Sequence, residues 1–547
     1  MSQLSIRKIG KALILSVPQV RRLYDFSLAL KTENHGIKAQ LLRQSSLLAE
    51  MELSGDAQDV LTRELPEDFD GQCLELERRI LLVLGSKQLS KMPVDSQTRW
   101  IQQIFTQCIS RLHPKSGLFA ELIDELLPEI FRCPTLPIAS ACQLYEAMYG
   151  LYWCGAQSLM DMRGFDAQTV GLFRGYLSSH GFAGRKDSEK FRLPEKEIKV
   201  GYFCHYAYET KGNALAPVVS ALAKKHAARK DRKIFVYCVQ WVSQAFIDEF
   251  DGSGVTVRNY PNQMDYAQLD NLAAAIQTDK IDVVITEVAS SIANYVFAKR
   301  VAPCQMWLEP GYPFWSNPDV DWVLVPGKEW QPWFGIPRDR HSHLRLGLPL
   351  ASGGNTPTAD ELKEAKLKLP SDVKIFAVFT RLIKVTPTYL DVVKRILTHV
   401  PKTHMLFVGT GDSRLINSFI RDDAIKGRVT LLNENVDLNV YGRLIDVFLD
   451  TFPFIGGLAC RDVACHGKPV VSLLAGEWDI LLKEERIPSL LVSSVDEYFD
   501  VATRLVLDDQ FYKASAAETL MLSAHKNDGV EMISDVEFGI SCALRNL

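Results

Sequence analysis

Two adjacent glycines, Gly456 and Gly457, separate a short apolar run from an amphipathic segment. Paired glycines ahead of a helix let backbone N–H groups come close to an anion such as a phosphate. Leu458 and Ala459 complete the loop, and Asp462 follows about one helical turn later, where a carboxylate can accept hydrogen bonds from ribose hydroxyls. The pattern predicts a sugar-nucleotide site, although a plain tight turn explains the glycines alone equally well.

A second loop contributes cationic side chains. Thr380, Arg381 and Lys384 follow the apolar run 374–378, and Pro387 is suited to open the next helix. An ammonium group at the carboxyl end of a strand can neutralise a diphosphate as it leaves a sugar. We therefore predict that Lys384 is catalytic and that Thr380 and Arg381 are further donors to the nucleotide.

Two amides follow a third apolar run, 429–432. Asn433 and Asn435 lie in a loop that is placed to recognise a base through backbone groups. An Asx-rich turn is the alternative explanation.

Candidates for the acceptor side lie earlier in the chain. His205 and Glu209 follow the apolar run 198–203, and either could take a proton from an acceptor nucleophile. A single histidine near a strand end is more often structural. A second, aromatic loop, Gly311-Tyr312-Pro313, is predicted either to line the same cleft or to pack as a buried connection.

Two Asp-x-Asp patterns could hold Mg²⁺ on a diphosphate, at 68–70 and 319–321. The first lies in a helical region and the second begins a strand-like run, so we predict no metal site. The chain contains neither a GxSxG nor a GxxxxGK[ST] pattern, which argues against a serine hydrolase and a P-loop NTPase.

The elements that must position these residues change type along the chain. Residues 1–190 show helical spacing and predict an all-α domain, but no convincing 34-residue repeat is found there. Two series of short apolar runs alternate with helical segments afterwards, as in doubly wound parallel sheets. We predict a first Rossmann-like domain at 196–350 on the acceptor side. A second, at 351–547, would bind the nucleotide and carry the C-terminal helix, and the two would face a common cleft.

The bulk composition narrows the function classes. The 547 residues suit about three domains, and the net charge of −4 argues against a nucleic-acid binder. Eleven cysteines without a CxxC pattern read as reduced thiols in a cytoplasmic protein. No apolar run reaches the ~18 residues of a membrane span.

With these motifs assembled, the chain resembles the GT-B glycosyltransferases of the O-GlcNAc transferase family, whose bacterial cousins include cytoplasmic adhesin N-glucosyltransferases. The four stretches that carry the resemblance are 199–202, 305–313, the Lys384 loop and 449–471. The resemblance implies a GT-B fold and an inverting transfer from a UDP-sugar to a protein side chain, without metal or cofactor. It also implies that Lys384 binds the diphosphate, that Asp462 binds the ribose and that Gly456–Ala459 faces the phosphates.

The chain departs from this family in three places. Arg381 replaces an amide residue, Leu458 and Ala459 replace hydroxyl-bearing residues, and the loop before Gly311 is altered. The donor sugar and the acceptor, Asn or Ser/Thr of an adhesin or other surface protein, therefore stay open. A protein acceptor could dock on the N-terminal helices. The alternatives are a GT-B transferase with a glycan or lipid acceptor, and a non-catalytic scaffold of the same fold.

Overall fold

The protein is described by a computed structural model. It describes residues 127–128, 130–155, 159–182, 197–205, 215–239, 242–260, 268–308, 315–326, 340–344, 357–411, 413–474, 487–524 and 530–546. The chain divides into two compact units, 1–156 and 157–547. In the first unit, helix α9 spans Ile138–Gly155. The rest of the predicted all-α domain up to residue 126 lies outside the described residues.

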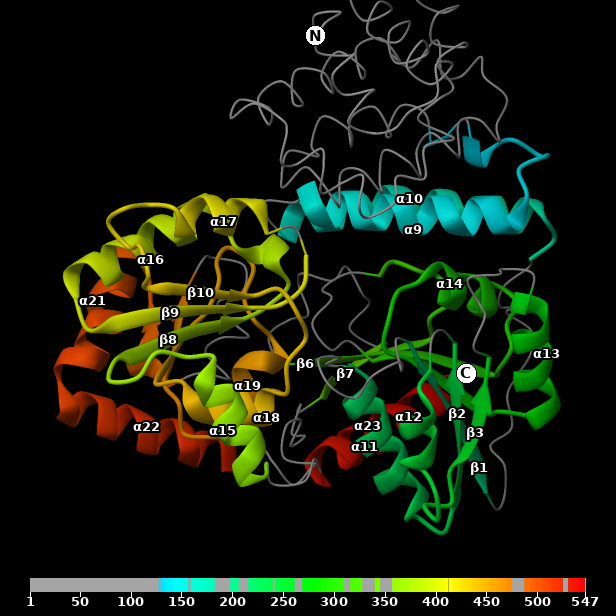
Figure 1. Ribbon diagram of the computed structural model, residues 1–547. Helices are drawn as coiled ribbons and strands as arrows, with labels where there is room; N and C mark the ends of the chain where they lie inside the picture. Colours follow the sequence, from blue (N-terminus) through cyan, green and yellow to red (C-terminus); the bar gives the residue numbers. More distant parts are fainter. Residues whose placement is uncertain are drawn as a thin grey trace, which may run out of the picture. The chain divides into compact units, whose positions relative to one another are not determined.

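The second unit contains two parallel sheets (Figure 1). The first has the order β3-β2-β1-β4-β5-β6-β7. Its strands are β1 (Ile198–Cys204), β2 (Arg232–Cys238), β3 (Thr256–Asn259), β4 (Val283–Thr286), β5 (Cys304–Leu308), β6 (Trp322–Pro326) and β7 (His341–Leu344). The helices around it are α10 (Leu159–Ser179), α11 (Leu215–Ala227), α12 (Gln244–Asp248), α13 (Leu269–Asp279) and α14 (Ser291–Ala298).

The second sheet has the order β10-β9-β8-β11-β12-β13. Its strands are β8 (Lys374–Phe379), β9 (Thr403–Val408), β10 (Val429–Leu432), β11 (Val447–Leu449), β12 (Val470–Leu473) and β13 (Leu491–Val492). The helices are α15 (Ala359–Leu367), α16 (Pro387–His399), α17 (Arg414–Ile420), α18 (Leu438–Leu444), α19 (Leu458–Ala464), α21 (Val495–Leu507) and α22 (Asp509–Ala524). Short 3₁₀ turns, η3 (Leu382–Lys384) and η4 (Pro488–Leu490), complete it.

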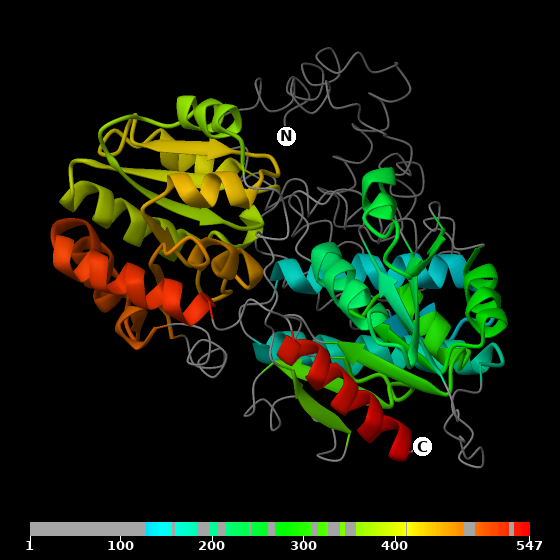
Figure 2. The same cartoon turned by 90° about the horizontal axis from the view of Figure 1, so that it is seen from below.

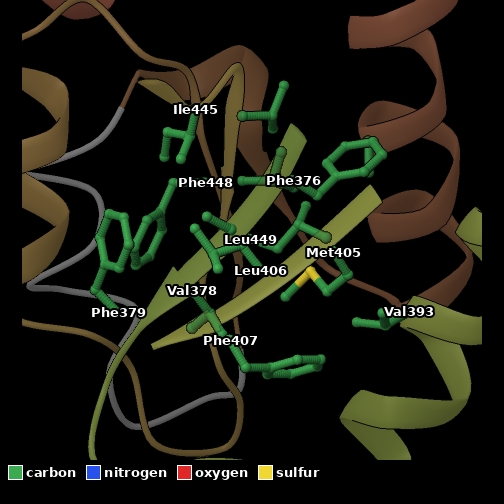
Figure 3. Packing of buried hydrophobic residues seen from close by; sticks show 14 of the residues in the cluster. Phe376, Val378, Phe379, Val393, Met405, Leu406, Phe407, Ile445, Phe448 and Leu449 are labelled. Atoms are coloured by element: carbon green, nitrogen blue, oxygen red, sulfur yellow. The ribbon is translucent and has the colours of Figure 1, made fainter. Parts of the chain in front are cut away.

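The predicted α/β fold with two doubly wound parallel sheets is confirmed. Continuous apolar runs gave its buried strands, because a parallel strand is covered on both faces and does not alternate. Strands β3 and β7 had no such signal, since β3 is half-exposed and β7 is built from His-Ser-His-Leu. The core of the second sheet is shown in Figure 3, with Phe376, Phe407 and Phe448 among its large side chains.

Helices cover both faces of the second sheet. Helices α16 and α21 contact each other, and α18 contacts both α15 and α19 (Figure 1). Pro387 opens α16, and the side chain of Thr386 caps it by accepting from Tyr389 N, which confirms the expected helix start after the Lys384 loop.

Two helices differ from the expected domain assignment. Helix α10, expected in the N-terminal domain that ends at residue 190, falls in the second unit and contacts α14. Its Arg174 forms an ion pair with Asp319, and its Asp166 accepts from Ser316 N at 2.8 Å.

The last helix, α23 (Val530–Arg545), was expected within the domain 351–547 but packs on β6 and β7 of the first sheet. Figure 2 shows this helix, in red, beside those strands. Its buried residues follow helical spacing, so the sequence contained the signal for a helix but not for its partner sheet. They are Met532, Val536, Ile540, Ala543 and Leu544. Within the described residues, no helix is long and apolar enough to cross a membrane.

Candidate functional site

The strand order of the second sheet reverses direction between β8 and β11. These neighbouring strands pair in parallel, and the chain leaves them toward opposite sides of the sheet. Ligands of open α/β sheets bind outside the carboxyl ends of the strands at such a point. The Lys384 loop follows β8 and the glycine loop follows β11, so topology brings the two predicted halves of the site together.

Contacts between successive loops confirm that this edge is one continuous surface. Leu382 N donates to Thr410 O at 3.1 Å, and Asn433 Nδ2 donates to Gly411 O at 3.3 Å. A Cβ on Gly409 would lie 1.7 Å from the carbonyl oxygen of Thr380, and its φ is +150°, so only glycine allows the β8 and β9 loops to approach this closely. Residues after β8, β9 and β10 therefore meet at the same edge.

Lys384 connects this edge to the glycine loop. Its Nζ donates to the carbonyl oxygen of Ile455 at 2.8 Å. Burial and the neighbouring Arg381 guanidinium lower the pKa of Lys384 to about 8, while Asp450 and Cys460 oppose that shift. An ammonium whose solvation is this poor gains strongly from an anionic ligand.

Asp450, directly after β11, holds the other side of the same peptide unit. Its Oδ1 accepts from Gly456 N at 2.5 Å and its Oδ2 accepts from Ser472 Oγ at 2.8 Å. The carboxylate is fully buried. The peptide between Ile455 and Gly456 is thus bound at its carbonyl by Lys384 and at its amide by Asp450. The motif analysis did not select Asp450 as a site residue, although a carboxylate immediately after an apolar strand is a recognisable signal.

The two glycines have different roles. A Cβ on Gly456 would lie 2.9 Å from Cys460 Sγ and 3.0 Å from Asp450 Oδ1, so this position requires glycine for close packing. Nothing lies within 4 Å of a Cβ on Gly457, which is exposed. Gly457 is therefore the member of the pair that a ligand can approach through the backbone.

Four other predicted nucleotide contacts lie around the loop. Leu458 and Asp462 are buried in α19 and Ala459 is half-buried, while Arg381 is exposed beside Lys384. Asn433 and Asn435 are both exposed after β10, as a base-reading loop requires. The structure brings all the predicted nucleotide residues to one sheet edge, and their roles as ligands stay predictions.

His205 occupies the equivalent reversal point of the first sheet, between β1 and β4. Its Nδ1 lies 3.2 Å from Glu287 Oε1, its Nε2 lies 2.9 Å from Ser290 Oγ, and its backbone N donates to Glu287 Oε1 at 2.6 Å. All three side chains are buried, and His205 has no exposed surface. In this arrangement His205 ties β1 to the start of α14, and both of its ring nitrogens contact these two partners. The sequence analysis missed Glu287 and Ser290, which no motif marks.

Several predicted residues lie outside the described part of the chain. These are Glu209, Gly311, Tyr312 and Pro313, together with the Asp-x-Asp pattern at 68–70. In the other such pattern, Asp319 pairs with Arg174 and Asp321 pairs with Arg300 Nη2 at 2.6 Å. Among the described residues, no group of three or more His, Cys, Asp or Glu side chains is arranged to hold a metal ion.

Part of the chain, including the candidate site, is similar to a known protein family. Residues 346–526, which contain the whole Lys384–Asp450–Gly456 arrangement, match the family described as glycosyl transferase family 41. About a third of the chain is therefore similar to family 41, and the chain has the GT-B fold.

Curated relatives share sequence with this chain, and one solved structure shares its fold. The chain is 26% identical over 341 residues to a probable UDP-N-acetylglucosamine–peptide N-acetylglucosaminyltransferase SPINDLY of Solanum lycopersicum, covering 58% of this chain and 35% of that one. It is 28% identical over 172 residues to a UDP-N-acetylglucosamine–peptide N-acetylglucosaminyltransferase of Caenorhabditis elegans, covering 29% and 15%. The chain thus spans about a third or less of these relatives. A mutant O-GlcNAc transferase of Thermobaculum terrenum superposes with a TM-score of 0.54 at 16% identity, covering 96% of this chain and 98% of that one, which shows a shared fold.

Proposed function

We propose that this protein is a UDP-sugar-dependent glycosyltransferase that moves a hexose or N-acetylhexosamine to a protein side chain. The observation that carries the proposal is the meeting of Lys384 with the glycine loop at the reversal point of the second sheet. This meeting lies inside the segment that matches family 41. Relatives named as acting with UDP-N-acetylglucosamine on peptides support the donor and acceptor classes.

The chemistry at the donor side follows from the residues at this edge. The acceptor attacks C1 of the sugar from the face opposite the diphosphate, the C1–O bond to the diphosphate breaks, and the configuration at C1 inverts. The Lys384 ammonium, assisted by exposed Arg381 and the Gly457 backbone, balances the charge that develops on the departing UDP. A cation that is already in place makes the proposed reaction independent of metal.

The acceptor loses one proton as it attacks, and a base must receive it. Glu209 stays the predicted base, while the contacts of His205 favour a structural role for that residue. The proposed acceptor is an Asn or Ser/Thr side chain of an adhesin or another surface protein that docks on the N-terminal helices. We propose that the reaction takes place in the cytoplasm, and the free thiols of the eight described cysteines support a reducing compartment.

The test is a donor screen with two readouts. The purified protein is incubated with UDP-glucose, UDP-galactose or UDP-N-acetylglucosamine, and UDP release is measured in the presence of candidate acceptor proteins and of water alone. Intact-mass analysis of proteins encoded by neighbouring genes, co-expressed with and without this chain, identifies the sugar from the mass increase. UDP binding without turnover of any donor would support a non-catalytic scaffold instead. A mass increase found only on lipid or glycan would show that the acceptor is not a protein.

A further inference from the structure

One peptide unit at the candidate donor site is bound at both of its polar atoms by ionisable side chains. Lys384 Nζ donates to the carbonyl oxygen of Ile455 at 2.8 Å, and the adjoining amide of Gly456 donates to Asp450 Oδ1 at 2.5 Å. A peptide plane held at both ends cannot rotate without losing two charge-assisted hydrogen bonds. The pair therefore fixes the backbone immediately before Gly457.

Asp450 is itself held by the core of the second sheet. Ser472 Oγ, on the adjacent strand β12, donates to Asp450 Oδ2 at 2.8 Å, and the Tyr498 hydroxyl donates to Asp450 O at 2.9 Å. The side chain is fully buried at the end of β11. The absent Cβ of Gly456 leaves the room that this carboxylate fills. Asp450 thus connects the glycine loop by hydrogen bonds to the rigid core of the second sheet.

We propose that Asp450 is a positioning residue for the donor. It orients the 455–456 peptide so that the Lys384 ammonium and the backbone at Gly457 are presented together to a diphosphate. An ammonium has three N–H donors, and Ile455 uses one of them, so Lys384 can keep this contact while it binds an anion. The inference rests on the proposed function, because it assigns a role within the same site.

The charge of Asp450 has a second consequence for Lys384. The titratable groups that act on this ammonium are Arg381, which disfavours its protonated form, and Asp450 and Cys460, which favour it. Burial disfavours the protonated form most strongly. Removing the negative charge of Asp450 should therefore lower the pKa of Lys384 further and reduce the protonated fraction near neutral pH.

The decisive variant is Asp450→Asn. The side-chain oxygen of Asn can still accept from Gly456 N, and its amide can donate to Ser472 Oγ, so the shape is kept and the charge is lost. The matched control is Asp446→Asn at the opposite end of the same strand. Like Asp450, Asp446 accepts from a backbone amide, Ile375 N at 2.8 Å; it forms an ion pair with Lys374 at 3.1 Å and lies away from the loop.

Two measurements are made on both variants. The first is steady-state kinetics, in which Asp450→Asn should lower kcat/KM for the donor roughly ten- to hundred-fold, mainly through KM, while Asp446→Asn stays within about two-fold. The second is competitive acetylation followed by mass spectrometry, which follows the reactivity of Lys384 against pH. The reactivity midpoint should move to lower pH in Asp450→Asn and stay unchanged in Asp446→Asn.

The outcomes separate this inference from the proposed function. If the wild-type protein releases no UDP from any donor, the proposed function fails, and acetylation still decides whether Asp450 acts on Lys384. Equal labelling profiles and equal donor kinetics in the two Asn variants would overturn the positioning role. If Asp450→Asn does not fold, Ser472→Ala replaces it. Faster hydrogen exchange of the peptide that contains Gly456 is then expected, and unchanged exchange overturns the inference.

Discussion

Glu537 of the C-terminal helix forms an ion pair with Arg232 at the start of β2, with 2.5 Å between Oε2 and Nη2. The other oxygen of Glu537 contacts the buried His226 of α11, whose Nδ1 lies 2.8 Å from the hydroxyl of Tyr202 in β1. The Glu537 carboxylate therefore connects α23 directly to β2 and α11, and through His226 to β1, across more than 300 residues of sequence. Both partners of the ion pair are largely buried, so removing one of them would leave the other charge buried without a partner. The docking of α23 on the first sheet therefore depends on this pair.

Glu537→Gln should destabilise the protein, most at neutral pH. Burial alone would raise the pKa of Glu537, but hydrogen bonds and charge from His226 and Arg232 lower it to about 2 from an ordinary value of 4.5. This contribution is complete above pH 4.5 and is lost as the pH falls toward 2. We expect a loss of about 3 kcal/mol in the free energy of unfolding at pH 7. The difference from wild type should shrink on acidification.

Urea unfolding across this pH range measures the effect. Glu531→Gln, an exposed position on the same helix, is the control and should change stability by less than about 0.5 kcal/mol. Equal losses of stability in the two variants would show that the ion pair of Glu537 does not hold α23 on the first sheet.

The two glycines of the donor loop should respond differently to alanine. Gly456→Ala places a Cβ against Cys460 Sγ and Asp450 Oδ1, and should cost about 2 kcal/mol of stability through overpacking. Gly457→Ala meets no atom and should leave the unfolding midpoint nearly unchanged. If a diphosphate approaches the backbone there, this variant should instead raise KM for the donor. Thermal unfolding and donor kinetics on both variants test the assignment, which fails if Gly457→Ala leaves KM for the donor unchanged.

Donor turnover should decline at mildly alkaline pH. Burial and Arg381 place the pKa of Lys384 near 8, so the ammonium that stabilises the leaving diphosphate is lost as the pH rises through 8 rather than near 10.5. The pH profile of kcat/KM reports this group in the free enzyme.

Lys384→Arg tests the origin of that decline. An arginine stays protonated across this range, so the alkaline limb should disappear even where the rate is reduced by its different geometry. Lys384→Ala should lower turnover about a hundred-fold or more while the fold is retained. An alkaline limb that persists in Lys384→Arg would assign it to another group.

His205→Asn should act on stability rather than on proton transfer. The variant removes buried hydrogen bonds to Glu287 and Ser290, at a cost of about 2–3 kcal/mol. If His205 is structural, the folded fraction keeps the wild-type acid limb of the kcat profile. Ser290→Ala, which breaks one of these contacts and removes the cap of α14, should show the same pattern with a smaller change. A loss of turnover of about a thousand-fold or more in a stable His205→Asn protein would instead restore it as the base.

The local features of this fold were readable in the amino-acid sequence. The apolar runs of β8, β9 and β11 predicted buried parallel strands because such strands are covered on both faces. Thr386 and Pro387 predicted the start of α16 because capping depends only on neighbouring residues. The rule that ligands of open α/β sheets bind beyond the carboxyl ends of the strands placed Lys384 and the glycine loop in one site. The strand order that makes β8 and β11 neighbours came from the tertiary structure.

Contacts between residues distant in sequence were decided only by the tertiary structure. No local pattern states that Asp450 binds Gly456 while Lys384 binds Ile455, or that His205 is enclosed by Glu287 and Ser290. The docking of α23 on the first sheet was likewise decided by the tertiary structure. The sequence of an amphipathic helix shows which of its faces is buried but not which sheet that face packs on. Sequence spacing therefore determined the elements and their chemistry, whereas packing decided which charged groups meet and which become buried, and so which of them are able to act on a ligand.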